Sequence, residues 1–185
     1  TAYEIPKRDW SSDVCSSDLC ADDADIKAAL KELKDAAKPI IVVGGGAVKS
    51  QAGAEVVALA DKLQIPIATS LHARALVPDD HALGVGVPGS YSRWCANKAV
   101  AAADLVFFIG SHAGGQVTNG WSIPRIGVRT IQLDIDPSEL GRNYPNAVSL
   151  CGDAKATLTA MLGQAGGPTQ RAEWLEQCQG YVADF

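Results

Sequence analysis

The chain has 185 residues, 47% of them hydrophobic, which is enough for one domain with a well-formed core. Its formal charge of -5 provides no basic surface for nucleic acid, and no apolar run approaches the roughly 20 residues that span a bilayer. Five cysteines form no C-x-x-C pair and are not at metal-ligand spacing to the histidines. We therefore predict free thiols, no metal site and a cytoplasmic protein.

The start of the chain differs in character from the rest. Residues 1–8, TAYEIPKR, lack the apolar segment of a signal peptide and do not begin with methionine, so we expect the chain to be cut from a longer protein. The following stretch, DWSSDVCSSDL, matches without a break the in-frame reading of a common sequencing-library adapter. We therefore interpret residues 9–19 as a cloning or assembly scar that carries no function.

Helical and strand-like segments alternate from Ala21 onwards. The expected helices, with apolar residues at helical spacing, cover 22–36, 52–63, 92–103 and 153–162. The expected strands, each an unbroken apolar run, cover 40–43, 65–69, part of 82–89, 104–110, 129–136 and 147–153. This alternation predicts an α/β fold: a Rossmann-like three-layer domain with a roughly six-stranded parallel sheet and helices on both faces.

The end of the chain reads as a linker followed by one more helix. The segment QAGGPTQ, residues 164–170, is a linker by composition, and RAEWLEQCQGYVADF reads as the start of a helix that is cut short. We therefore assign residues 21–163 to one domain, and residues 164–185 to a linker and the start of a truncated following domain.

Four of the expected strands end in small or acidic residues, in the turns GGG (44–46), SLH (70–72), GSH (110–112) and DID (134–136). Because the carboxyl ends of parallel strands share one edge of a sheet, we expect these turns to line one crevice. Glycine lets a backbone approach a phosphate closely, and an aspartate at a strand end can accept from ribose hydroxyls. The four turns together predict a dinucleotide-type crevice, although a strict G-x-G-x-x-G is absent.

Each of these turns also has an interpretation without a ligand. The three glycines can form a tight turn, and Asp134 and Asp136 can cap a helix that follows them. His72 and His112 are typical of ordinary loop residues, and His81 is typical of a solvated turn.

The order of these motifs resembles a known family. The chain resembles the central domain of thiamine-diphosphate-dependent enzymes, most closely the acetolactate synthase-like branch, through the segments KPIIVVGGGAV, LADKLQIPIATSLHARALVPDDHALGVGVPGSY, ANKAVAAADLVFFIGS, QVT, TIQLDIDPSELGRN and VSLCGDAKATLTAML. The resemblance covers Ala21 to Leu162. Residues 1–8 resemble the end of the same family's pyrimidine-binding domain.

The resemblance implies a three-domain enzyme whose central domain does no thiamine chemistry. Thiamine diphosphate and Mg²⁺ are held by the other two domains, so we expect neither cofactor, no metal and no catalytic residue in this chain. In relatives the central domain holds FAD, ADP or nothing. The resemblance implies adenosine and flavin contacts from Gly44, Gly45, Gly46, Ser70, Leu71, His72, Gly86, Gly89, Gly110, Gln116, Val117, Asp134, Ile135, Asp136, Gly152 and Asp153.

One departure from the family pattern bears on FAD. Flavin-binding members carry G-x-R-F-D-D-R-V-T after the strongest strand, and here His112 and Gln116 replace the two arginines. Neutral His and Gln cannot match the charged fork with which Arg holds a diphosphate. The loss of two charge-assisted contacts is expected to cost about 3 kcal/mol or more, around a hundredfold in affinity. A different nucleotide, or a crevice that is only a scaffold, is the alternative to FAD.

Two functions remain open at this point. The first is a fragment, inactive alone, of a thiamine-diphosphate-dependent 2-keto acid decarboxylase or carboligase that is a homodimer or homotetramer at full length. The second is a free-standing module that binds FAD, NAD or ADP. Trp94 and Trp121 either contact another subunit or pack against the sheet, and we favour packing.

Overall fold

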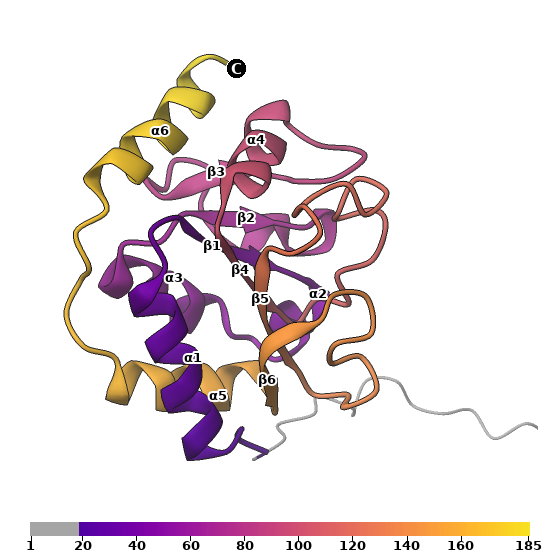
Figure 1. Cartoon of the computed structure of the whole chain (residues 1–185), viewed down its shortest axis with the longest axis vertical. Helices are drawn as coiled ribbons and strands as arrows, with labels where there is room; N and C mark the ends of the chain where they lie inside the picture. Colours follow the sequence, from indigo (N-terminus) through magenta and orange to yellow (C-terminus); the bar gives the residue numbers. More distant parts are fainter. Residues whose placement is uncertain (1–18) are drawn as a thin grey trace, which may run out of the picture.

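The centre of the molecule is a single parallel sheet. The structure, a computed structural model, describes residues 19–185, so the predictions for residues 1–18 lie outside it. Its strands stand in the order β3-β2-β1-β4-β5-β6 and every pair is parallel, which confirms the predicted α/β, Rossmann-like fold (Figure 1). The strands are β1 (Pro39–Val43), β2 (Ile67–Thr69), β3 (Gly84–Gly86), β4 (Leu105–Ile109), β5 (Arg129–Asp134) and β6 (Asn146–Cys151).

Helices cover both faces of this sheet and make it the middle of three layers. One core lies between the sheet and α1, α3 and α5, and a second core lies under α4 and α6. In α1, acidic residues in the first turn and Lys34 in the last turn complement the helix dipole. The long helices are α1 (Asp23–Asp35), α3 (Gly53–Leu63), α4 (Trp94–Ala102), α5 (Ala154–Gln164) and α6 (Ala172–Ala183).

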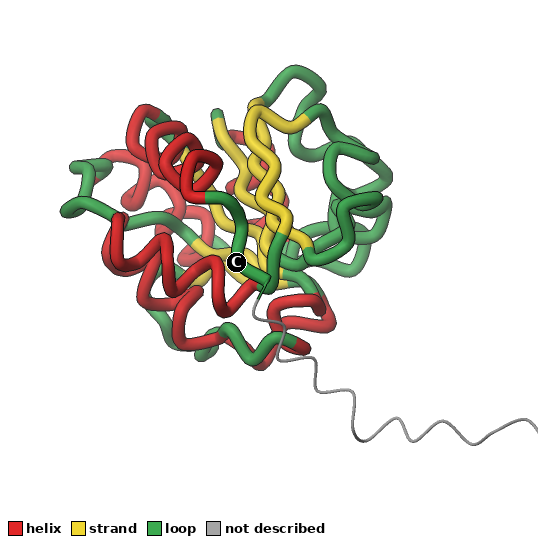
Figure 2. Tube along the Cα trace, turned by 90° about the horizontal axis from the view of Figure 1, so that it is seen from below, coloured by secondary structure: helices red, strands yellow, loops and turns green. Residues whose placement is uncertain are grey.

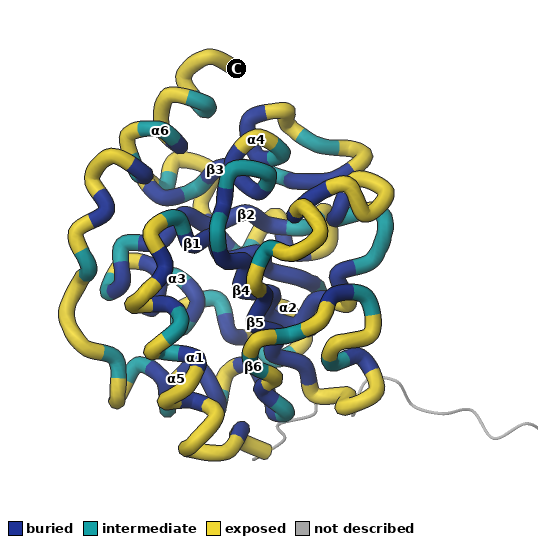
Figure 3. The backbone as a smooth tube through the Cα atoms, in the orientation of Figure 1, coloured by how far each residue is buried: buried dark blue, intermediate teal, exposed yellow. Residues whose placement is uncertain are grey.

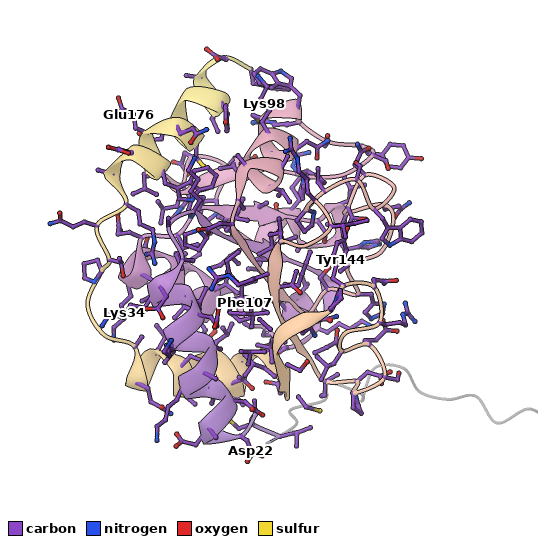
Figure 4. All side chains as sticks on the ribbon, in the orientation of Figure 1. Asp22, Lys34, Lys98, Phe107, Tyr144 and Glu176 are labelled. Atoms are coloured by element: carbon purple, nitrogen blue, oxygen red, sulfur yellow. The ribbon has the colours of Figure 1, made fainter. Side chains whose placement is uncertain are left out.

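Alternation along the strands explains why both faces need a cover. In β4, Leu105, Phe107 and Ile109 join the core beneath α1, α3 and α5. Val106 and Phe108 point the other way and join the second core. All residues of β1 and β4 are buried (Figure 3), and Phe107 lies near the centre of the molecule (Figure 4). Both central strands are therefore continuous apolar runs, as expected of a parallel sheet.

The C-terminal helix α6 packs on the α4 side of the sheet, beside β3 (Figure 1). Trp174 is 2% exposed, and its Nε1 donates to the carbonyl oxygen of Pro39 at 2.9 Å. Just before the helix, Arg171 is buried and its guanidinium donates to carbonyl oxygens at the ends of α1 and α3. The helix thus shares the core of this domain, while the boundary between residues 163 and 164 stays a prediction.

Two short elements that were not predicted follow β1 and β2. Helix α2 (Gly45–Lys49) begins inside the glycine turn, and the 3-10 helix η1 (Leu71–Leu76) follows Ser70. The two elements contact each other, and Figure 2 shows most of the loops gathered on one side of the strands. Within residues 19–185, none of the helices has the length and apolar character to cross a bilayer.

Candidate nucleotide-binding cleft

A cleft of about 800 Å³ lies at the carboxyl edge of the sheet. It is bounded by the segments that follow β1, β2, β4 and β5, together with Pro88 and Tyr91 after β3. The strand order reverses its direction between β1 and β4, and open parallel sheets bind ligands at such a reversal. The structure therefore brings the four turns noted in the sequence to one cleft.

Twelve of the sixteen residues predicted to contact a nucleotide line this cleft. They are Gly44, Gly45, Gly46, Ser70, Leu71, His72, Gly110, Gln116, Val117, Asp134, Ile135 and Asp136. The other four, Gly86, Gly89, Gly152 and Asp153, lie outside its lining. Contact with a nucleotide stays a prediction for all sixteen.

Packing between two loops explains the glycines at the centre of the cleft. A Cβ on Gly44 would lie 2.2 Å from the carbonyl oxygen of Gly110. Gly110 has a φ of +56°, and its own Cβ would lie 2.3 Å from the backbone nitrogen of Ala47. The turns after β1 and β4 therefore press against each other. Gly45 differs, because its Cβ would meet only the Cβ of His72, at 3.4 Å.

The four predicted residues outside the cleft have structural roles. Gly86 ends β3 with a φ of +93°, and a Cβ on Gly89 would lie 1.8 Å from the carbonyl oxygen of Gln116. A Cβ on Gly152 would lie 2.6 Å from a threonine hydroxyl of α5. Asp153 caps α5, since its Oδ1 accepts a backbone N–H of the first turn at 3.0 Å. Loop packing and capping account for these residues without a ligand.

The two aspartates after β5 line the cleft and also hold their own loop. Asp134 is 7% exposed, and its Oδ1 accepts the backbone N–H of Asp136 at 3.1 Å. Oδ1 of Asp136 accepts the hydroxyl and the backbone N–H of Ser138, at 2.7 and 2.9 Å. These bonds lower the pKa of the Asp136 carboxyl. Asp136 therefore caps a turn and not the helix that was expected to follow it, since residues 137–140 form turns, while its carboxylate remains at the cleft.

A buried hydroxyl and a lysine give the cleft features that suit a nucleotide. The Oγ of Ser70 is buried and has no hydrogen-bond partner within the described part of the chain. Lys49, in the last turn of α2, lines the wall of the cleft. An unpaired buried hydroxyl is costly, and a lysine favours an anion.

The residues that replace the family's two arginines both lie at the cleft. His112 is exposed, and its Nδ1 lies 3.8 Å from Oε2 of Glu139. The Glu139 carboxylate is buried, and its Oε1 pairs with Nη1 of Arg142 at 2.8 Å. Gln116 lines the cleft from the same loop as His112. The wall where arginines were expected therefore carries a titratable imidazole and a neutral amide.

Three side chains lie in surroundings that the sequence did not predict. His81 is largely buried rather than solvated, and its Nε2 lies 3.4 Å from Oδ1 of Asp61. Trp121 is 56% exposed, and Trp94 lies at the surface with the Lys98 ammonium 4.1 Å above its ring. Neither tryptophan belongs to the cores on the two faces of the sheet, and a contact with another subunit stays a prediction.

The cysteines and acidic side chains form no metal centre in residues 19–185, where no group of three or more His, Cys, Asp or Glu side chains is placed to hold an ion. The four cysteines within this range are free thiols, as predicted. One of them, Cys178, lines a second cavity of about 390 Å³ between β3 and α6. Burial raises the pKa of its thiol to about 12, so the thiol is protonated and unreactive at neutral pH.

Comparison with known proteins points to one family. The family model described as thiamine pyrophosphate enzyme, central domain, matches residues 26–161. The chain is 33% identical over 154 residues to a probable acetolactate synthase large subunit of Methanocaldococcus jannaschii, covering 82% of this chain and 26% of that protein. It is 31% identical over 160 residues to an acetolactate synthase of Mycobacterium leprae, covering 84% of this chain and 26% of that protein. The chain is 32% identical over 164 residues to an acetolactate synthase large subunit of Corynebacterium glutamicum, covering 86% of this chain and 26% of that protein.

The matched region contains the whole sheet and the whole cleft. Residues 26–161 include all six strands and every residue that lines the cleft. The chain spans about a quarter of the length of these relatives. The matched sequence and the six-stranded parallel sheet agree, and the chain belongs to the family of thiamine pyrophosphate enzyme central domains.

Proposed function

We propose that this chain is the central domain of a cytoplasmic, acetolactate synthase-like enzyme that acts on a 2-keto acid. The observation that carries the proposal is the identity of 31–33% with acetolactate synthases over most of this chain and only a quarter of theirs. Thiamine diphosphate supplies the decarboxylation and carbon-transfer chemistry in such an enzyme, and Mg²⁺ accompanies its diphosphate. In this proposal both cofactors are held by domains outside the chain, and the chain alone is inactive. The full-length enzyme forms a homodimer or homotetramer.

The domain assignment belongs to the same proposal. Residues 1–8 would be the end of the preceding pyrimidine-binding domain, and residues 9–19 a scar. Residues 21–163 would be the central domain, and residues 164–185 a linker and the start of a truncated following domain. Exposed apolar side chains support contacts with another domain or subunit: Ile126 is 96% exposed and Trp121 is 56% exposed on the same loop.

The enzymatic part is tested by comparing two proteins in one pyruvate-consumption assay. Residues 1–185 alone are expected to consume no pyruvate, because the thiamine-binding residues lie elsewhere. The longer protein that contains this chain is expected to consume pyruvate only when thiamine diphosphate and Mg²⁺ are added. Consumption by the isolated chain, or consumption by the longer protein without thiamine diphosphate, would contradict the proposal.

We further propose that the cleft binds a nucleotide with an adenosine diphosphate group, such as ADP or FAD. Asp134 and Asp136 can accept from ribose hydroxyls, the Ser70 hydroxyl needs a partner, and Lys49 can pair with a phosphate. The volume of the cleft is within the range of nucleotide and cofactor sites.

Thermal unfolding with and without ligand tests this binding. A ligand at about 100 times its Kd stabilises the folded state by about 2.7 kcal/mol, which raises Tm by roughly 5 to 10 °C in a domain of this size. FAD binding would also give purified protein a flavin absorbance band near about 450 nm, a property of the cofactor itself. Unchanged Tm with millimolar ADP, FAD and NAD would leave the cleft as scaffold only.

A further inference from the structure

The charge of the cleft depends on its histidines. Its lining contains one lysine, Lys49, against two carboxylates, Asp134 and Asp136. The other titratable groups on its walls are His72, His112 and the phenol of Tyr91. When both imidazoles are neutral, negative charge outweighs positive charge in the lining. Protonation of the histidines reverses this balance, so the affinity for an anion must depend on pH across the range where histidine titrates.

Of the two histidines, His112 lies beside a buried carboxylate, that of Glu139. Oε2 of Glu139 is a buried carboxylate oxygen without a hydrogen-bond partner among residues 19–185, and it faces Nδ1 of His112 at 3.8 Å. The other oxygen, Oε1, is already paired with Nη1 of Arg142 at 2.8 Å. A buried, unpaired carboxylate oxygen favours a nearby N–H donor strongly. The surroundings of His112 therefore favour a proton on its Nδ1.

This orientation decides what His112 offers to a ligand. With a proton on Nδ1, the Nε2 of the neutral imidazole carries a lone pair and can only accept a hydrogen bond. Phosphate oxygens also only accept, so neutral His112 has no donor for them. Protonation places a second N–H on Nε2 and adds a full positive charge, which converts the same side chain into a charge-assisted donor.

We propose that His112, oriented by the buried Glu139 carboxylate, is a pH-dependent contact for the diphosphate of the nucleotide in this cleft. This inference rests on the proposed nucleotide binding and adds the residue and the condition that control it. The site is then a binder of diphosphate diesters whose affinity rises as the pH falls through the titration of the imidazole.

Other charged groups around His112 are of both signs. Asp136 lies close enough that His112 contributes, after the hydrogen bonds of Ser138, to lowering the pKa of the Asp136 carboxyl. The charged groups nearest the imidazole are the carboxylates of Asp136 and Glu139 and, through Glu139, the guanidinium of Arg142, while Lys49 lines the same cleft. The side-chain amide of Asn143 donates to the carbonyl oxygen of His112 at 2.7 Å, and this hydrogen bond links the His112 loop to the segment after β5.

The test is isothermal titration calorimetry, which measures the Kd of ADP-ribose for residues 1–185 at about pH 5.5 and about pH 8, at constant ionic strength. ADP-ribose and FAD both carry a diphosphate diester whose charge is constant over this range, whereas the terminal phosphate of ADP titrates near about pH 6. We expect ADP-ribose to bind more weakly at the higher pH, with a Kd that is roughly tenfold larger. FAD is expected to show the same ratio, and adenosine, which lacks phosphate, no change with pH.

Matched variants identify the histidine. His112→Gln is expected to bind weakly and equally at both pH values, and His112→Arg tightly and equally. Glu139→Gln is expected to move the midpoint of the change to lower pH. His81→Gln, outside the cleft, is expected to keep the ratio between the two Kd values. Circular dichroism of each variant confirms that it is folded before titration.

Each contrary outcome has a distinct meaning. A Kd for ADP-ribose that is the same at both pH values overturns this inference and leaves nucleotide binding intact. So does an unchanged ratio in His112→Gln, a ratio lost in His81→Gln, or an equal pH dependence for adenosine. Failure of ADP-ribose and FAD to bind at either pH contradicts the proposed nucleotide binding itself, and the inference falls with it.

Discussion

Replacement of Arg171 by alanine should destabilise the domain more than any single exposed charge does. The Arg171 guanidinium is buried, and burial lowers its pKa. It donates to the carbonyl oxygens of Leu33 and Ala36 at the end of α1, the latter at 3.1 Å, and of Leu63 at the end of α3 at 2.9 Å. These carbonyl groups have no partner within their own helices and form the negative ends of the helix dipoles.

The size of the effect follows from these contacts. Hydrogen bonds to a charged group contribute about 1.5 to 3 kcal/mol each, and truncation leaves several buried carbonyl oxygens without a donor. Allowing for water that enters the site, we expect Arg171→Ala to cost about 3 to 5 kcal/mol of unfolding free energy. Arg171→Lys should lose somewhat less, because it keeps a positive charge and some donors. It should still lose stability, because one ammonium cannot reach carbonyls at the ends of two helices as the planar fork does.

The assay is urea unfolding followed by circular dichroism, with Arg129→Ala as the matched control. Arg129 also contacts α1, through an ion pair with Glu32 at 2.7 Å, but its side chain is 44% exposed. The control should lose no more than about 1 kcal/mol, whereas Arg171→Ala should lower Tm by roughly 6 to 20 °C. Equal unfolding free energies of the two variants would refute the reasoning, because they would show that the contacts of Arg171 with α1 and α3 do not stabilise the domain.

Two further predictions concern the loop glycines and the buried thiol. Gly110→Ala should cost about 2 to 4 kcal/mol in urea unfolding, because the new Cβ would meet Ala47 at 2.3 Å and φ is +56°. Gly114→Ala, with no atom within 4 Å of its Cβ, should change stability by less than about 0.5 kcal/mol, and similar losses would contradict the loop packing. The pKa of Cys178 is raised to about 12 in the folded state, so the unfolded chain, with a pKa near about 8.5, ionises first. Stability should therefore fall by up to about 1.4 kcal/mol per pH unit between these values, and this part of the loss should vanish in Cys178→Ala; an identical pH profile for the variant would contradict it.

The strands and long helices could be predicted because local pattern and tertiary burial agree. The run that was predicted as a strand over 40–43 forms β1 with one more residue, and the strand over 104–110 forms β4 with one fewer at each end. Both are central strands, buried on both faces, so an unbroken apolar sequence is what their position requires. The edge strand β3 has only three residues, and its boundaries were correspondingly vague.

The short elements could not be predicted, because packing rather than propensity forms them. Helix α2 begins with two glycines, which are poor helix formers, and it is held against the β4 turn by the contact between Gly46 and Gly110. Lys49 was missed as a cleft residue for this reason. Had α2 been predicted, its position one turn after Gly45 would have placed Lys49 near the same edge.

The four predicted turns do meet at one cleft, but the sequence did not explain all of their glycines. The rule that strand ends meet at one edge placed the four turns correctly, since it depends only on parallel topology. It did not distinguish glycines that a ligand requires from glycines that a neighbouring loop requires, as at Gly44 and Gly89. The contact between Glu139 and His112 joins residues far apart in sequence, and no local pattern indicates it.

The sharpest test of the whole account is a residue-resolved nuclear magnetic resonance titration of residues 1–185 with ADP-ribose. We expect the amide shifts to concentrate in the segments after β1, β2, β4 and β5, including Gly45, Ser70, His112 and Asp134. Shifts centred instead on the cavity between β3 and α6, or no shifts at millimolar ligand, would contradict it.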